Sequence, residues 1–313
     1  MTRKLGDREV TEIGFGCMGL SWAYTSADEH SVDQEAILHH ALDTGIQLLD
    51  TSDFYGPFTN EELIGKVLRT RRDDAVISTK GGLVPSDTAF SAHDGRPEHI
   101  RNACDGSLRR LGIDHIDLYM LHRVDPDVPL EETWGAMAEL VAAGKVRNIG
   151  LCEVSVEQCI AAAEIHPVAA VQSELSIWER GALDEVLPWC HSAGAAFLAF
   201  SPLGRGFLTG TFSSKTEFRN DDFRSSNPRF SKDAMSKNQR IVDVIADVAR
   251  SHNATPAQIS LAWLLAIDDS VIPIPGTTKR HRIDENFAAL DIRLSTTDIE
   301  MLSSIPQAVQ PRY

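Results

Sequence analysis

The sequence predicts an α/β fold, namely a (β/α)8 TIM barrel with an N-terminal β-hairpin and extra C-terminal helices. Eight short aliphatic and β-branched runs alternate with helix-like segments, and they lack the polar alternation of half-exposed strands. The 313 residues contain no linker, repeat or low-complexity segment, so we expect a single domain over residues 1–313. The eight runs are residues 13–19, 46–50, 75–80, 116–122, 148–152, 169–172, 195–200 and 271–275.

Before the first strand, residues 3–13 have the pattern of a hairpin that turns at Gly6-Asp7 and could plug the N-terminal end of the barrel. Helix signals then recur between the strands. Ser155 and Gln158 form a predicted capping box, and Thr255 is an N-cap followed by a proline at the first helical position. Gly112 and Gly144 are expected at helix C-termini, where a left-handed residue is needed.

Composition limits the classes of partner. A net charge of −15 argues against nucleic acid and anionic membranes, and no apolar run approaches the roughly 20 residues of a membrane span. The N-terminus lacks an apolar signal segment, so we expect a cytoplasmic protein. Histidine and cysteine spacing predicts no metal site and no disulfide framework. The five scattered cysteines are Cys17, Cys104, Cys152, Cys159 and Cys190.

Polar side chains end several of the predicted buried strands. Asp50, Lys80 and His122 each close such a run, and Tyr55 follows Asp50 by five residues. In a parallel barrel these strand ends share one rim, so a lysine could lower the pKa of the tyrosine, and the histidine could orient a carbonyl. Taken singly, each residue is better explained by a plain structural role: Asp50 as a cap, Tyr55 as part of a turn, Lys80 as an exposed lysine and His122 as a core histidine. Four such residues at the same end of successive strands make that joint explanation much weaker. We interpret Asp53 as a turn or capping residue without a catalytic role.

These residues lie in the motifs DTSDFYG, STKGG and YMLHR, and further motifs follow in order: GFGCMGLS, GKVRNIGLCE, FSPLGRGFLTG and PIPGTTKRHRIDEN. The chain resembles the aldo-keto reductase superfamily, in particular the bacterial and plant branches that resemble potassium-channel β subunits. The resemblance implies NADPH-dependent reduction of an aldehyde or ketone to an alcohol, with hydride passing directly from the nicotinamide. Tyr55 would be the proton donor, Lys80 and Asp50 would tune it, and His122 would orient the carbonyl.

The resemblance also implies cofactor contacts. Cys152, where serine or threonine is more usual, would contact the carboxamide with Glu153 and Gln172, and Phe200 would stack on the nicotinamide. The predicted contacts along the rest of the cofactor are Met18 and Gly19 near the first strand; Ser201, Leu203, Gly204, Arg205 and Gly206 at the pyrophosphate; Gly276, Thr277, Thr278, Lys279 and Arg282 at the 2′-phosphate; and Glu285 and Asn286 at the adenine. Thr277-Thr278 would also cap a helix beginning near Lys279. GFGCMG has the glycines of a dinucleotide-binding turn, but eight strands that alternate with helices favour a closed barrel over an open Rossmann sheet.

The substrate, a small-molecule carbonyl, would meet residues on the rim loops. Trp22, Tyr24, Phe54, Arg123 and Trp178 are the predicted wall, while Phe90 is expected only to pack a loop and Arg123 could equally pair with Asp125. The irregular segment 211–230 has phenylalanines with which to dock over the cofactor. Two other functions compete: an NADPH-binding redox sensor with little turnover, and a phosphate-binding barrel isomerase or lyase. Specificity depends on loop shape, so the sequence predicts a carbonyl substrate and no particular one. A homo-oligomer is possible, and the sequence favours neither direction of the reaction.

Overall fold

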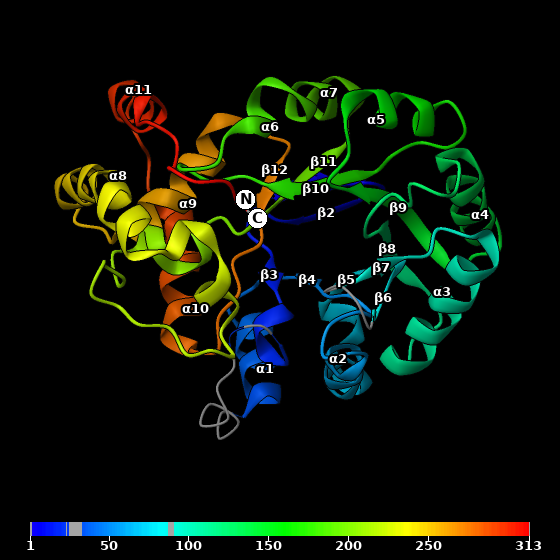
Figure 1. Cartoon of the computed structure of the whole chain (residues 1–313). Coiled ribbons are helices and arrows are strands. Elements are labelled where there is room, and N and C mark those ends of the chain that lie inside the picture. Colours follow the sequence, from blue (N-terminus) through cyan, green and yellow to red (C-terminus); the bar gives the residue numbers. More distant parts are fainter. Residues whose placement is uncertain (1, 23, 25–32, 87–90, 313) are drawn as a thin grey trace.

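The computed structural model describes residues 2–22, 24, 33–86 and 91–312. Its main sheet has eight parallel strands, and helices surround it on the outside (Figure 1). In sheet order the strands are β3 (Phe15–Gly16), β4 (Leu48–Asp50), β5 (Val76–Gly81), β8 (Ile116–Leu121), β9 (Val146–Cys152), β10 (Ala170–Glu174), β11 (Ala196–Phe200) and β12 (Val271–Pro273). All eight predicted strands are therefore confirmed.

Backbone hydrogen bonds join the two ends of this sheet. The amide of Gly14 donates to Pro273 O at 3.0 Å, and the amide of Gly16 donates to Pro275 O at 3.2 Å. Because β3 and β12 lie at the two ends of the strand order, these bonds close the sheet into a barrel. The predicted TIM barrel is confirmed.

The helices follow the strands in the order expected for the barrel. The predicted capping box at Ser155 and the predicted N-cap at Thr255 are both present, and Gly112 is a left-handed C-cap. In the described part of the chain, three helices are additional to the strand–helix repeat: α6 precedes α7 after β10, α8 is inserted between β11 and α9, and α11 follows α10. The helices are α1 (Gln34–Asp43), α2 (Thr59–Arg71), α3 (Pro97–Leu111), α4 (Leu130–Ala142), α5 (Val156–Ala163), α6 (Gly181–Asp184), α7 (Val186–Ala193), α8 (Lys232–Ser251), α9 (Pro256–Ile267), α10 (Arg280–Phe287) and α11 (Thr296–Ser304).

The N-terminal residues form the predicted hairpin, with β1 (Thr2–Leu5) and β2 (Arg8–Thr11) paired antiparallel. Leu5 and Val10 are buried in the same apolar cluster as the inward-facing side chains of the barrel strands. The Arg3 guanidinium donates to carbonyl oxygens at the start of β12, including that of Asp268 at 2.7 Å. The hairpin thus covers the N-terminal end of the barrel and leaves the opposite rim for the site.

The barrel strands place alternate side chains inside and outside the barrel. Leu48, Val76 and Leu118 belong to the inner apolar cluster, whereas Ile77 and Tyr119 belong to the larger cluster between strands and helices. Within the described part of the chain, no helix is long and apolar enough to cross a membrane.

Candidate active site

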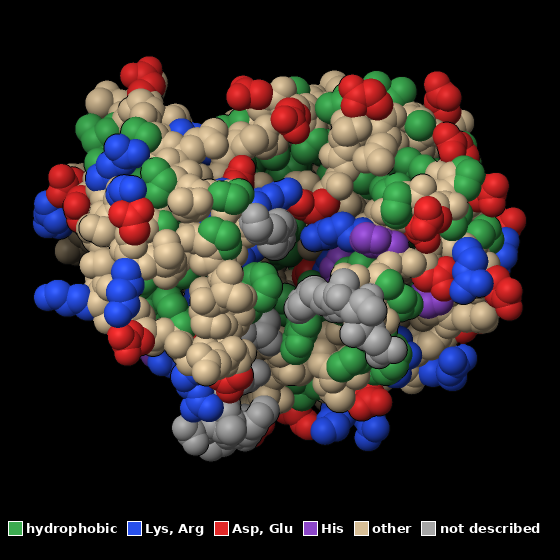
Figure 2. Space-filling view, viewed as in Figure 1, with side chains coloured by type: hydrophobic (Ala, Val, Ile, Leu, Met, Phe, Trp, Pro, Cys, Tyr) green, Lys and Arg blue, Asp and Glu red, His purple; other side chains and the backbone are tan. Residues whose placement is uncertain are grey.

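The candidate catalytic residues extend the inward-facing rows of the barrel strands. Asp50 lies two residues beyond Leu48, Lys80 four beyond Val76, and the same period places His122 in line with Leu118. Asp50 pairs in register with Ser78, and Lys80 with Met120. The apolar filling of the barrel therefore ends at the rim in a layer of polar side chains. In Figure 2, basic, acidic and histidine side chains gather around a hollow near the centre of one face of the molecule.

An ion pair forms the centre of this layer. Lys80 Nζ lies 2.6 Å from Asp50 Oδ1 and 2.7 Å from Thr51 O, and the lysine side chain is completely buried. The second carboxylate oxygen of Asp50 accepts hydrogen bonds from Ser78 Oγ at 2.8 Å and from Gln172 Nε2 at 2.9 Å. Each oxygen of the buried carboxylate is thus hydrogen-bonded, as burial of a charge requires.

Tyr55 completes what we call the inner cluster, made of Asp50, Tyr55, Ser78, Lys80 and Gln172. Its hydroxyl lies 3.5 Å from Lys80 Nζ, and the ammonium also lies 5.2 Å from the centre of the tyrosine ring. The sequence analysis predicted that Asp50, Tyr55 and Lys80 lie together, but it did not predict the hydrogen bond from Gln172 to Asp50. Ser78 was missed altogether, although it has the same inward parity as Lys80.

The electrostatics of Tyr55 differ from the expectation. Burial raises the pKa of the Tyr55 hydroxyl to about 12, and the opposing effect of Lys80, which lowers it, is smaller. Burial alone would lower the pKa of Lys80, but Asp50 and Tyr55 raise it above its ordinary value, so the lysine is charged. The prediction of a lowered tyrosine pKa considered the cation and neglected desolvation. The result is a tyrosine that keeps its proton at neutral pH.

His122 lies against the tyrosine at the rim. The two ring centres are 5.9 Å apart in an edge-to-face arrangement, and Phe54 contacts the other side of the imidazole at 6.4 Å. Burial, followed by the charges of Lys80 and Arg123, holds the pKa of His122 well below its usual range. A neutral imidazole at this point can donate one hydrogen bond toward a carbonyl oxygen.

The residues predicted for the carboxamide end of the cofactor lie on β9, on β10 and directly after β9. Cys152 is buried, and burial raises the pKa of its thiol to about 12, which makes it a neutral thiol. Glu153 has a left-handed backbone with φ of 54°, pairs with Arg312 of the C-terminal tail, and accepts the amide of Glu174 at 3.1 Å. All five cysteines are free and buried, in agreement with the sequence.

The segment after β11 has an unusual backbone. Ser201, Gly204, Arg205 and Gly206 all have positive φ, and a Cβ at Gly204 would lie 2.7 Å from the Trp178 ring. Such a run of left-handed residues turns amide groups toward one side, as anion-binding loops do. The Arg205 side chain is only 6% exposed and lies 3.7 Å from Glu174.

At the start of α10 the predicted cap is wrong. Lys279 is the N-cap residue and makes no side-chain cap bond, while Thr277 Oγ1 accepts only the Lys279 amide, at 3.2 Å. A short turn between Thr277 and Lys279 replaces the cap, because α10 begins at Arg280 with Lys279 as its N-cap residue. Lys279 and Arg282 are exposed at this helix N-terminus, and Asn286 is buried within α10. Gly276 approaches the backbone of Gly16 so closely that a Cβ would lie 2.4 Å from Gly16 O.

The predicted substrate wall is only partly assembled. Trp22 lies 6.0 Å from Tyr55 and 5.3 Å from Phe54, so two predicted aromatic residues do surround the inner cluster. Trp178, however, is fully buried and stacks on Phe207 at 5.1 Å, which makes it a core residue and no wall.

Two further predicted wall residues, Arg123 and Tyr24, contact other residues of the chain. Arg123 donates to His122 O at 2.6 Å, and the Asp125 carboxylate accepts the amides of Gly95 and Asp127. Tyr24 lies against the guanidinium of Arg224 at 5.0 Å. Phe90 lies outside the described residues.

The irregular segment 211–230 is docked on the barrel by its aromatic residues, as predicted. Phe218 contacts Phe230 at 5.4 Å, and Phe230 contacts Trp178 at 6.0 Å. Arg229 is buried and donates to Gln310 O, while Asn227 donates to Arg312 O. Segment 211–230 and the C-terminal tail are therefore hydrogen-bonded to each other beside β9 and β10. No local sequence pattern predicts this contact.

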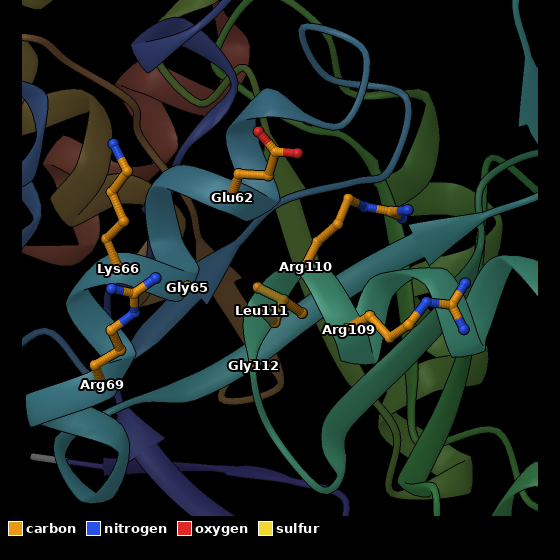
Figure 3. A pocket seen from close by; sticks show the side chains of 8 residues that line it. All are labelled: Glu62, Gly65, Lys66, Arg69, Arg109, Arg110, Leu111 and Gly112. Carbon is orange, nitrogen blue, oxygen red and sulfur yellow. The ribbon is translucent and has the colours of Figure 1, made fainter.

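A separate hollow of about 440 Å³ lies outside the barrel between α2 and α3 (Figure 3). It shares no residue with the inner cluster, so the chemistry of the strand ends lies elsewhere. Its walls are formed by Glu62, Gly65, Lys66, Arg69, Arg109, Arg110, Leu111 and Gly112.

Comparison with known proteins identifies the family of this chain. The model of the Aldo/keto reductase family matches residues 12–307. The chain belongs to the aldo/keto reductase family. Two relatives are similar over nearly the whole chain. A probable aldo-keto reductase 1 of Glycine max is 41% identical over 97% of this chain and 88% of the relative. The aldo-keto reductase yakc [NADP(+)] of Schizosaccharomyces pombe is 42% identical over 96% of this chain and 89% of the relative.

Solved structures of aldo/keto reductases superpose on the fold. A glycerol dehydrogenase from Gluconobacter oxydans has a TM-score of 0.88 at 28% identity, with 100% of this chain and 98% of that chain covered. An aldo/keto reductase from Klebsiella pneumoniae, solved with NADP and acetate, has a TM-score of 0.74 at 27% identity, with 100% and 97% covered. Membership of the aldo/keto reductase family confirms the predicted oxidoreductase class, and it does not support the isomerase or lyase alternative.

Proposed function

We propose that this chain reduces an aldehyde or ketone to an alcohol with NADPH, with Tyr55 as the proton donor. The observation that carries the proposal is the buried arrangement of Asp50, Lys80 and Tyr55 beside a neutral His122 at the barrel rim. The printed name of the Schizosaccharomyces pombe relative contains NADP(+), and the Klebsiella pneumoniae structure holds NADP.

The residues of this chain fit such a cofactor. The left-handed residues Ser201, Gly204, Arg205 and Gly206 suit a pyrophosphate, and the uncapped N-terminus of α10, with Lys279 and Arg282, suits a 2′-phosphate. Gln172 donates its amide hydrogen to Asp50, which leaves its carbonyl oxygen to accept from a carboxamide. When bound, the nicotinamide supplies the hydride.

The side chains then supply the proton and the orientation. His122 donates a hydrogen bond to the substrate carbonyl oxygen, and as that oxygen gains charge it takes the Tyr55 hydroxyl proton. The cost of the tyrosinate that forms is lowered by the Lys80 ammonium, which Asp50 holds in place at 2.6 Å. A pKa of about 12 for Tyr55 ensures that the proton is present before the reaction begins.

Turnover of NADPH with 4-nitrobenzaldehyde, followed at the nicotinamide absorbance, tests the proposal. Tyr55→Phe should lower turnover roughly 100- to 10,000-fold while NADPH still binds. Tyr119→Phe is the matched control, since the Tyr119 hydroxyl is buried without a hydrogen-bond partner and lies outside the barrel. Binding of NADPH without turnover on any carbonyl would support the redox-sensor function, and absence of binding would exclude both functions.

The preference for NADPH over NADH has its own test. Arg282→Ala should weaken NADPH binding roughly 10- to 100-fold, the value of a charge-assisted hydrogen bond, and leave NADH nearly unchanged. The neighbouring exposed Arg280 provides the control substitution Arg280→Ala. An equal loss for both cofactors would show that Arg282 does not recognise the 2′-phosphate. Fluorescence titration of the bound nicotinamide measures both constants.

A further inference from the structure

The Ser52 hydroxyl lies within hydrogen-bond distance of both His122 and Asp53. Ser52 is fully buried, and its Oγ lies 3.1 Å from His122 Nδ1, 3.3 Å from Asp53 Oδ1 and, more distantly, 3.5 Å from Lys80 O. It also accepts the Phe54 amide at 3.1 Å. A hydroxyl has one hydrogen to donate, so Ser52 cannot donate to the histidine and to the carboxylate at the same time.

The destination of this hydrogen decides which nitrogen of His122 carries its own. A neutral imidazole has one N–H and one lone pair. If Ser52 donates to Nδ1, the ring hydrogen is on Nε2. If Ser52 donates to Asp53, Nδ1 carries the hydrogen and donates to the Ser52 oxygen, which leaves a bare lone pair on Nε2.

Asp53 lies in a second buried polar group on the helix side of β5, which we call the outer cluster: Asp53, Glu61, Thr79, Arg110 and Tyr119. Glu61 from α2 is fully buried, accepts Thr79 Oγ1 at 2.6 Å and pairs with Arg110 of α3 at 2.7 Å. Arg110 donates hydrogen bonds to Glu61 and, at 3.3 Å, to Ser107 Oγ, and its charge also acts on Asp53.

This environment makes Asp53 a group that titrates near neutrality. Burial, and then the neighbouring Glu61, raise the pKa of Asp53 to about 7, while Arg110 and the hydrogen bond from Ser52 oppose the shift. Tyr119 of β8 and Cys104 of α3 are the other titratable groups facing this side, and burial raises the pKa of both well above neutrality. On the barrel side, the charged groups that face His122 are Lys80 and Arg123.

We propose that Asp53 is a positioning residue which, through the Ser52 hydroxyl, sets the tautomer of His122. With Asp53 protonated, the Ser52 hydrogen goes to the closer acceptor, His122 Nδ1, and Nε2–H is available to a carbonyl. With Asp53 ionised, the carboxylate draws the hydrogen, and Nε2 becomes an acceptor suited to an alcohol. The change involves no covalent step, since Asp53 exchanges its proton with water and so does the imidazole. The catalytic consequence rests on the proposed reductase function; the tautomer change does not.

Nitrogen-15 spectra of His122 in the full-length protein test the tautomer directly, with His122→Gln to identify its signals. From about pH 5.5 to about pH 8.5, either side of the Asp53 pKa of about 7, the wild type should shift from Nε2–H toward Nδ1–H. Asp53→Asn should remain Nε2–H throughout, because the amide N–H can donate to Ser52. Asp114→Asn, at an exposed position, should behave as the wild type. A wild-type tautomer that does not change with pH would overturn the proposal, as would an Asp53→Asn variant that still switches.

Kinetics provide the second readout. Over the same pH range, the wild-type kcat for aldehyde reduction should fall several-fold, whereas that of Asp53→Asn should stay level with an unchanged KM. Ser52→Ala should also lose the pH dependence, because it removes the link between the two groups. Spectra that switch in a protein without turnover would contradict the proposed function and leave the tautomer inference standing. Turnover together with unswitching spectra would contradict the inference alone.

Discussion

The two faces of β5 carry different buried polar groups. On the barrel face, the inner cluster pairs one carboxylate, Asp50, with one ammonium, Lys80, and hydrogen bonds from neighbouring side chains reach both carboxylate oxygens. On the helix face, the outer cluster places Asp53 and Glu61 around a single guanidinium, that of Arg110. The charges of the inner cluster balance at neutral pH, whereas the outer cluster balances only while one carboxyl group keeps its proton. Balanced burial suits a fixed catalytic charge, and unbalanced burial suits a group that responds to pH.

The largest effect is expected from breaking the inner balance. Lys80→Met should lower reductase turnover roughly 100- to 10,000-fold, because the tyrosinate then forms beside the Asp50 carboxylate without a cation. It should also destabilise the fold by about 3–5 kcal/mol, since the carboxylate is left uncompensated. The double variant Asp50→Asn/Lys80→Met should recover the lost stability and none of the activity. Thermal unfolding and NADPH turnover measure the two effects. Substantial activity in Lys80→Met would contradict the role given to the lysine.

The outer cluster can be broken at its single cation. Arg110→Ala should cost about 3–5 kcal/mol of unfolding free energy at pH 8, where both carboxyl groups need compensation, and less at pH 6. Arg109→Ala is the matched control: Arg109 lines the same outer hollow (Figure 3) but is exposed, so its loss should change stability by less than about 0.5 kcal/mol. Equal costs for the two variants would show that Glu61 and Asp53 do not depend on Arg110.

The third prediction concerns how the unfolding free energy of an Asp53 variant depends on pH. The folded-state pKa of Asp53, about 7, lies above the ordinary value of 3.8, so its ionisation costs stability as pH rises between these values. Relative to the wild type, Asp53→Asn should therefore gain stability from pH 4 to pH 8, by a few kcal/mol at about 1.4 kcal/mol per tenfold change in the proton equilibrium. Urea unfolding at both pH values measures the gain. A difference that is the same at both would place the Asp53 pKa near its ordinary value.

The fold and the central ion pair follow from patterns that are local to the strands. Lys80 is predictable because a lysine at the end of a buried run needs a partner, and strand parity puts Asp50 on the same side. Ser78 could have been found by the same parity. The sequence analysis treated Asp53 as a plain turn residue, since nothing in DTSDFYG reveals that α2 and α3 cover it.

The error at Trp178 has a physical cause. Trp178 was assigned to a pocket wall because aromatic residues near a rim suit a substrate, but Phe207 and Phe230 enclose it. These contacts join segments far apart in the chain, and composition or spacing does not encode such contacts.

The hairpin at the N-terminal end of the barrel has a consequence for the order of folding during synthesis. Arg3 donates to the carbonyl oxygens of Leu265, Asp268 and Val271, which are 262, 265 and 268 residues further along the chain. The ribosome therefore makes the hairpin well before the carbonyl groups that anchor it. Contacts of such sequence separation form late. The N-terminal end of the nascent barrel is not closed by Arg3 until β12 has left the ribosome.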